Sequence, residues 1–277
     1  MGAIDAPAMS SPTVSPSLFD ASKRRSRLDR PGPALVVAAL GFATMLGGLI
    51  ASPHPYGSIA FVVDFLVAEL VLALVVVGSA LAFFPVADIG LRAPRAVAPW
   101  RLLPLALLSA GAVAAWWVAR AAVTDPAAAD LATTGRVLRT TALVGLNEEV
   151  LFRGLLLAAL WRAFGARRGA VAALVAFGVF HLLNVAGGLT PGAAAFQFVF
   201  TIVCGAVFLQ AAIGSGSLWP SIVGHALYDL VVFDLGRFAA AGAGHGPGLV
   251  LFALAVLTGL VSLAMLRGLG GRGPYPR

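Results

Sequence analysis

Apolar residues occur in long continuous runs along most of the chain, and polar and basic residues gather between these runs. A helix of about 20 apolar residues is long enough to cross the hydrocarbon core of a bilayer. The pattern therefore predicts an all-α fold, a polytopic transmembrane helical bundle of about eight membrane-spanning helices enclosing a polar site within the membrane. The predicted helices cover residues 34–51, 58–84, 102–123, 137–164, 170–185, 193–213, 218–235 and 249–266.

The segments on either side of the bundle are predicted to be cytoplasmic tails. Residues 1–33 are rich in Ser and Pro, which predicts disorder, and residues 267–277 form a short second tail. The bundle itself takes residues 34–266, and its motif-bearing part takes about 134–235. The basic stretch at the end of the first tail, expected to contact anionic lipid, comprises Lys23, Arg24, Arg25, Arg27 and Arg30.

The distribution of basic residues predicts how the bundle lies in the membrane. Arginines occur in both tails, in residues 85–101 and in the fourth connection, whereas the connections around Pro53, Pro126 and Gly187 carry neither Lys nor Arg. Connections rich in Lys and Arg stay on the cytoplasmic side. Both termini are therefore expected in the cytoplasm, although Arg237 falls on the predicted outer side.

Composition supports an integral membrane protein, because 60% of the residues are hydrophobic and only 11% are charged. The net charge of +7 comes from basic residues beside apolar runs, so no nucleic-acid partner is expected. A single cysteine, Cys204, excludes a disulfide framework and a multi-cysteine metal cluster. Abundant Arg, Ala and Gly indicate a GC-rich, bacterial genome, hence a multi-pass protein of the inner cell membrane.

The fourth predicted helix carries three ionisable residues at membrane depth, Glu148, Glu149 and Arg153. Residues four apart share a helix face, so Glu149 and Arg153 are expected to pair. Glu148 is rotated by about 100° from Glu149 and is left as the free carboxylate. Intramembrane charges usually serve function; the alternative is an ionic cluster that only fixes helix packing.

Two further helices carry histidines. Phe177 lies one turn before His181 on the same face, with Asn184 three residues beyond, and His225 lies four residues before Asp229. Each histidine alone could be an ordinary core residue or one oriented by a carboxylate.

Depth connects these histidines with Glu148. All three residues lie roughly 13 to 21 Å from the predicted cytoplasmic ends of their helices, so they can meet near mid-membrane. Such a trio can hydrolyse an amide, with Glu148 as the base, His181 sharing the water and His225 stabilising the oxyanion. Alternatively, two histidines and a carboxylate bind Zn²⁺, although the H-E-x-x-H signature is absent.

Together the three segments resemble the CPBP family, the CAAX-protease and bacteriocin-processing (Abi) intramembrane proteases related to the Rce1-type CAAX endopeptidase. The family motifs E-E-x-x-x-R, F-x-x-x-H and H-x-x-x-(N/D) stand here as Glu148-Glu149-x-x-x-Arg153, Phe177-x-x-x-His181 and His225-x-x-x-Asp229.

The resemblance implies an endopeptidase, a metalloprotease or a glutamate protease, that cleaves a membrane-associated protein or peptide. Where relatives have Asn, an ionised Asp229 would repel an oxyanion, so Asp229 must be protonated, orient His225 or ligate a metal. The implied catalytic residues are Glu148, Glu149, His181, His225 and Asp229, with Arg153, Phe177 and Asn184 supporting the site. The implied ligands of a Zn²⁺ cofactor are His181, His225 and Asp229.

Two other functions stay open at this point. A proton-coupled transporter could use the same buried relay, although no inverted repeat is visible, and a catalytically silent relative could act as an immunity or scaffold protein. Asp64 and Glu69 on the second helix either reach the site or serve helix packing.

Overall fold

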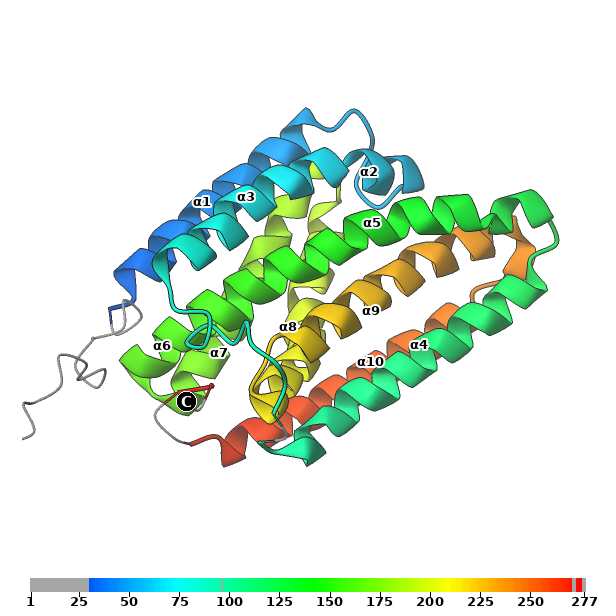
Figure 1. The fold of residues 1–277 in the computed structure, drawn as a ribbon. Helices are drawn as coiled ribbons and strands as arrows, with labels where there is room; N and C mark the ends of the chain where they lie inside the picture. The colour runs from blue at the N-terminus through cyan, green and yellow to red at the C-terminus, as the bar shows by residue number, and fades with distance from the viewer. Residues whose placement is uncertain (1–29, 96, 271–272, 276–277) are drawn as a thin grey trace, which may run out of the picture.

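The computed structural model describes residues 30–95, 97–270 and 273–275, and within these residues it is helical without strands (Figure 1). Most of the predicted first tail and part of the last lie outside the described residues. The main helices are α1 (Gly32–Ala51), α2 (Ile59–Asp64), α3 (Leu66–Phe83), α4 (Leu103–Ala122), α5 (Leu131–Glu148), α6 (Leu157–Phe164), α7 (Ala166–His181), α8 (Pro191–Ser215), α9 (Trp219–Phe238) and α10 (Gly246–Ala264). Between them lie the shorter segments η3 (Pro99–Leu102), η4 (Pro126–Ala129), η5 (Glu149–Leu156), η6 (Leu182–Gly187), η7 (Ala239–Ala243) and η8 (Met265–Gly268).

The helical bundle confirms the predicted fold class. Among the described residues, six helices are long and apolar enough to cross a membrane: Gly32–Ala51, Leu66–Phe83, Pro99–Ala122, Ala166–Gly187, Pro191–Ser215 and Gly246–Gly268. The two remaining predicted runs are helical too, as α5 with η5 and α6, and as α9. Both of these carry the charged motif residues, and the total of eight crossings stays a prediction.

One predicted helix is broken. The run 58–84 was expected to be continuous, but the structure divides it at Phe65 into α2 and α3. The Ser58 side chain accepts a hydrogen bond from the Phe61 N–H at 3.1 Å and thus caps the start of α2. Hydropathy does not show such a break, because the residues around it are apolar apart from Asp64 and Glu69.

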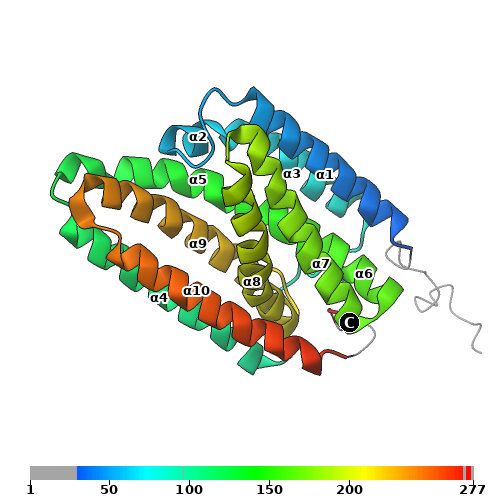
Figure 2. The same ribbon diagram turned by 180° about the vertical axis from the view of Figure 1, so that it is seen from behind.

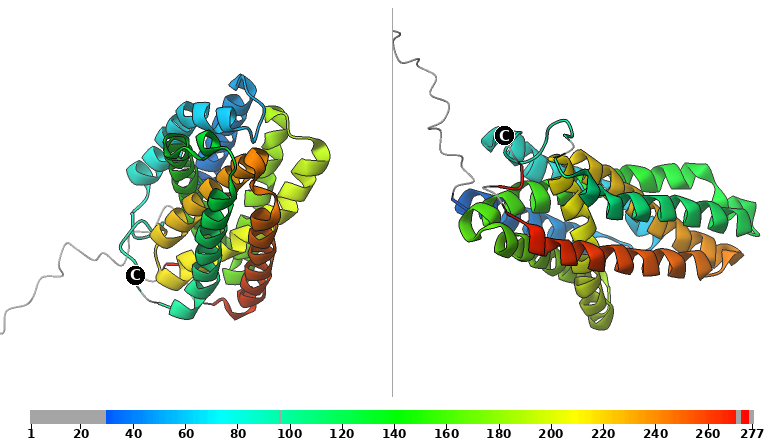
Figure 3. Two further views of the ribbon diagram at one scale, coloured as in Figure 1. Left: turned by 90° about the vertical axis from the view of Figure 1, so that its right-hand side faces the viewer. Right: turned by 90° about the horizontal axis from the view of Figure 1, so that it is seen from below.

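The helices pack in two groups. α1 and α3 lie side by side at one edge, α4 and α10 lie together at the other, and α5 and α9 run next to each other between them (Figure 1). α8 stands at a steep angle to α9 and α10 (Figure 2), and its first part projects beyond its neighbours (Figure 3). One hydrophobic cluster joins α1, α3, α6 and α7, and a second joins α4, α9 and α10 with part of α8.

The connections gather at two ends of the bundle. The arginine end, as we call it, holds the α3–α4, α6–α7 and α8–α9 connections and the segment after α10; there the Arg95 N–H donates to the Ser215 carbonyl at 2.7 Å. The opposite end holds the α1–α2, α4–α5, α7–α8 and α9–α10 connections, where the Tyr56 N–H donates to the Gly187 carbonyl at 2.8 Å. These contacts fix the connections of each end to one another.

Helices α5 and α9 approach closely at Gly145. A Cβ atom added there would lie 2.9 Å from the carbonyl oxygen of Ile222 and 3.0 Å from the backbone N of Ala226. At Gly135, on the same helix, nothing lies within 4 Å of such an atom. Of these two glycines of α5, Gly145 therefore serves helix packing and Gly135 does not.

We expect Gly145→Ala to destabilise the protein by about 1–3 kcal/mol, because the new methyl group pushes against backbone atoms. The matched control Gly135→Ala should be neutral or stabilising, since replacing a helical glycine by Ala gains up to about 1 kcal/mol. Thermal unfolding of both variants in detergent measures the difference. Equal shifts in Tm would show that the close α5–α9 contact at Gly145 does not determine the stability of the fold.

Candidate active site

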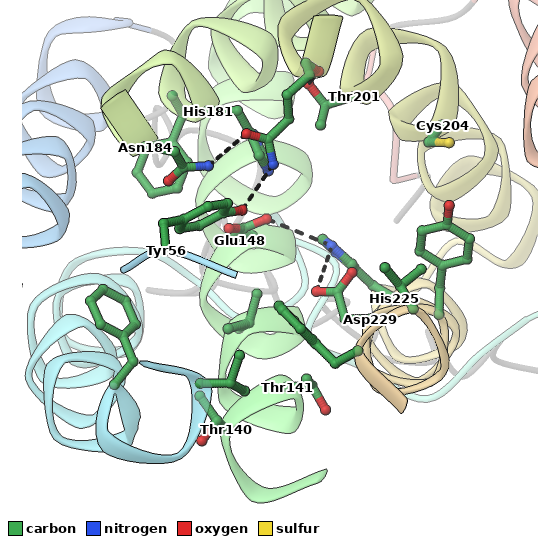
Figure 4. A pocket seen from close by; sticks show the side chains of 18 of the residues that line it. Tyr56, Thr140, Thr141, Glu148, His181, Asn184, Thr201, Cys204, His225 and Asp229 are labelled. Carbon is green, nitrogen blue, oxygen red and sulfur yellow. Dashed lines mark hydrogen bonds and ion pairs between the residues drawn. The ribbon is translucent and has the colours of Figure 1, made fainter. Parts of the chain in front are cut away.

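Glu148, His181 and His225 line one cavity of about 190 Å³ within the bundle (Figure 4). Glu148 is the last residue of α5, His181 the last of α7, and His225 lies in the second turn of α9. Glu148 and His225 are buried, with exposed fractions of 5% and 4%. The predicted meeting of these three helices is confirmed.

Glu149 is held by two partners on the side away from the cavity. Its Oε1 lies 3.0 Å from a guanidinium nitrogen of Arg153 and 2.9 Å from Nδ1 of His225. Arg153 also donates to the Gly205 carbonyl at 3.0 Å, and its guanidinium lies 4.2 Å from the ring centre of Phe177. The predicted Glu149–Arg153 pair is confirmed, whereas the hydrogen bond to His225 was not predicted.

Glu148 differs from Glu149 in lining the cavity; like Glu149, it has one buried carboxylate oxygen without a hydrogen-bond partner among the described residues. This oxygen, Oε2, lies 3.6 Å from Nε2 of His225, which is longer than a hydrogen bond. The two glutamates stand at a change of helix type, since α5 ends at Glu148 and the π-helix η5 begins at Glu149. Such π segments occur often at functional sites.

The ring of His181 has a fixed orientation. Its Nδ1 lies 2.9 Å from the carbonyl oxygen of Phe177, which can only accept, so Nδ1 carries the hydrogen. The Phe177 ring also packs edge-to-face against it, with ring centres 4.7 Å apart. In the neutral ring Nε2 is therefore free to accept a hydrogen bond from a ligand.

His225 is oriented by Glu149 and by an aromatic ring. The Glu149 carboxylate accepts from Nδ1, and Phe208 stacks on the imidazole with ring centres 4.5 Å apart. Nε2 faces two carboxylates, because Asp229 Oδ2 lies 3.6 Å away, at the same distance as Glu148 Oε2. Glu149 makes the shorter contact, so it orients this histidine more strongly than Asp229 does.

The cavity wall includes polar residues that the sequence did not reveal. Asn184 donates to the Gln197 side chain at 2.9 Å, and Gln197 in turn donates to the Tyr56 hydroxyl oxygen at 2.9 Å (Figure 4). Tyr56 thus keeps its own hydroxyl hydrogen for another acceptor. Only Asn184 was predicted to support the site, because Tyr56 lies in a connection and belongs to no motif.

The structure also separates the two acidic residues of the second predicted helix. Glu69 is buried, lines the cavity and accepts from the Asn147 side chain at 2.8 Å. Asp64 lies outside that cavity and pairs with His54 at 3.1 Å, with 54% of its side chain exposed. Glu69 is therefore the one that reaches the site.

The described residues hold no group of three or more His, Cys, Asp or Glu side chains placed to bind a metal ion. Both histidines have Nδ1 occupied and Nε2 free, as metal ligands commonly do. The carboxylates of Glu148 and Asp229 each lie 3.6 Å from Nε2 of His225, but they do not complete such a group with the two histidines. The residues as placed do not fit a metal site, and Zn²⁺ binding stays a prediction.

Removing Arg153 should strongly destabilise the fold. We expect Arg153→Leu to cost about 3–5 kcal/mol, because it leaves the buried Glu149 carboxylate without its guanidinium. The double variant Glu149→Gln/Arg153→Leu should recover part of this loss, since it removes the uncompensated charge. Unfolding of the single and double variants in detergent measures the coupling, and simple additivity of the two changes would contradict it.

The motif-bearing segment is similar in sequence to a known protein family. Residues 130–231 match a family model described as Type II CAAX prenyl endopeptidase Rce1-like. No curated protein and no solved structure matches the chain. The matched residues contain all three motifs and both histidines of the cavity. The match confirms the resemblance predicted from the motifs, that of this segment to the CAAX proteases.

Proposed function

We propose that this protein is an intramembrane endopeptidase that hydrolyses a peptide bond of a membrane-associated protein or peptide, with Glu148 as the general base. The observation that carries the proposal is the buried Glu148 carboxylate, which has a free oxygen at a cavity shared with His181 and His225. The match to an endopeptidase family supports the same reaction class.

Glu148 and His181 would activate the attacking water. The free Nε2 of His181 accepts one hydrogen of the water, and Glu148 takes the other as the oxygen attacks the carbonyl carbon. The new C–O bond gives a tetrahedral oxyanion. Glu148 then passes its proton to the amide nitrogen, the C–N bond breaks, and an amine and a carboxylic acid are released.

His225 would stabilise the oxyanion. The Glu149 carboxylate at 2.9 Å from Nδ1 favours a ring that carries both hydrogens, so Nε2 can donate to the developing negative charge. Asp229 lies beside the same nitrogen and can contribute a donor only in its protonated form. This requirement distinguishes the chain from relatives with Asn at that position.

The cavity lining indicates what kind of segment would bind. The apolar part of its wall is mostly aromatic, which favours a substrate with an apolar segment or a lipid-bearing residue. The aromatic side chains lining the cavity outside the motifs are Tyr56, Phe61, Phe65, Phe180, Phe200, Phe208, Tyr228 and Phe233.

Glu148→Gln tests the assignment of the base. The change keeps size and removes basicity, so we expect a loss of roughly 10²–10⁴-fold in cleavage. Membrane fractions of cells expressing the wild type and the variant are compared by sequencing of new protein N-termini. Asp64→Asn, at an exposed carboxylate, is the matched control and should leave the wild-type termini unchanged. Survival of the same termini in Glu148→Gln would refute the role of Glu148.

Metal dependence gives an independent test. Because the described donors do not fit a metal site, we expect less than one equivalent of metal in protein purified without added metal. Cleavage should also survive dialysis against a chelator. Stoichiometric zinc by elemental analysis, lost in His225→Ala, would show instead that the histidines rearrange around a metal.

A further inference from the structure

The cavity extends from the proposed catalytic residues in one direction only. On α5 its lining residues fall within 140–148, at or before Glu148, and on α9 they fall within 225–233, at or after His225. The start of α5 and the end of α9 both lie at the opposite end of the bundle. Glu148 and His225 therefore form the floor of the cavity.

Helix α7 gives the same direction. The lining residues of α7 and η6 fall within 177–184, where α7 ends, whereas those of α8 fall within 197–208, around the middle of that helix. No described residue from 149–176 or 209–224 lines the cavity. The lining residues of α5, α7 and α9 thus direct the cavity away from the arginine end.

The arginine end is closed beneath this floor. Glu149 and Arg153 are buried, with exposed fractions of 0% and 1%. The hydroxyl of Tyr275, near the C-terminus, donates to the Arg153 carbonyl at 2.8 Å, and the Leu218 N–H donates to the Gly90 carbonyl at 2.9 Å. These contacts leave no continuation of the cavity on that side.

The two ends of the bundle differ in how many basic residues their connections carry. The four connections of the opposite end contain neither Lys nor Arg, and the helix turns beside them carry Arg120, Arg136 and Arg237, of which Arg237 pairs with Asp130 and Asp234. The basic residues at or beside the connections of the arginine end are Arg92, Arg95, Arg101, Arg162, Arg167, Arg168 and Arg267. The acidic residue in these connections is Asp88.

We infer that the cavity opens toward the non-cytoplasmic side of the membrane and receives segments of exported or membrane-inserted polypeptides presented from that side. Connections rich in arginine are retained in the cytoplasm, which places the arginine end there and the cavity mouth on the other face. The inference rests on the proposed function for its substrate, but the direction of opening stands on geometry and charge alone. A cytoplasmic C-terminal peptide would meet the closed end.

Cysteine labelling tests the direction without any activity measurement. Tyr56→Cys places a thiol at the cavity wall in the α1–α2 connection, and Ala51→Cys marks the same end outside this cavity. Val97→Cys, 48% exposed in the α3–α4 connection, is the matched control at the arginine end. The wild type, whose single Cys204 is buried, supplies the background.

A charged, membrane-impermeant thiol reagent is added to intact cells stripped of outer barriers and to inside-out vesicles. We expect Tyr56→Cys and Ala51→Cys to be labelled only in the cells, and Val97→Cys only in the vesicles. The reverse pattern overturns the inference. Labelling of Ala51→Cys from the cell exterior without labelling of Tyr56→Cys from either side also overturns it, because the cavity would then not open there.

The protein N-termini produced by Glu148-dependent cleavage provide a second test of the direction in which the cavity opens. We expect their cleavage sites to map to the non-cytoplasmic side of the substrate proteins. Sites on cytoplasmic segments would overturn the inference and leave the protease assignment intact. Absence of any Glu148-dependent terminus, together with the expected labelling pattern, would refute the proposed function and leave the direction of opening in place.

Discussion

The buried carboxylate of Glu149 is the constraint around which the centre of the molecule is arranged. A charge removed from water costs several kcal/mol unless partners compensate it, and here Arg153 and His225 do so directly. Through these partners the carboxylate joins η5 to α9 and, by way of Gly205, to α8. The same cluster lies between the cavity and the arginine end.

Local spacing explains what could be predicted about the site. Glu149 and Arg153 are one helical turn apart, so their pairing follows from helix geometry and leaves Glu148 free. The proximity of Glu148, His181 and His225 follows from helix rise and a common membrane depth. The pairing and the common depth both depend on distances along individual helices, which the sequence gives directly.

The contacts that could not be predicted join residues far apart in the sequence. Gln197 and Tyr56 are 141 residues apart, Glu69 and Asn147 are 78 apart, and His225 and Glu149 are 76 apart. None of these pairs lies on one helix, so no periodicity relates them. The interruption at Phe65 was hidden for another reason, because Asp64 and Glu69 are single acidic residues in an otherwise apolar run and do not end its hydropathy signal.

The π-helix at Glu149–Leu156 makes the spacing of this segment matter as much as its composition. A π turn contains an extra residue relative to an α turn, so α6 follows α5 with a shifted rotational phase. Losing one residue there would return the segment toward α geometry and change which of its side chains face α7, α8 and α9. Arg153 and Glu149 would then contact different neighbouring residues. Insertions and deletions in this segment are therefore far less tolerable than replacements that preserve its length.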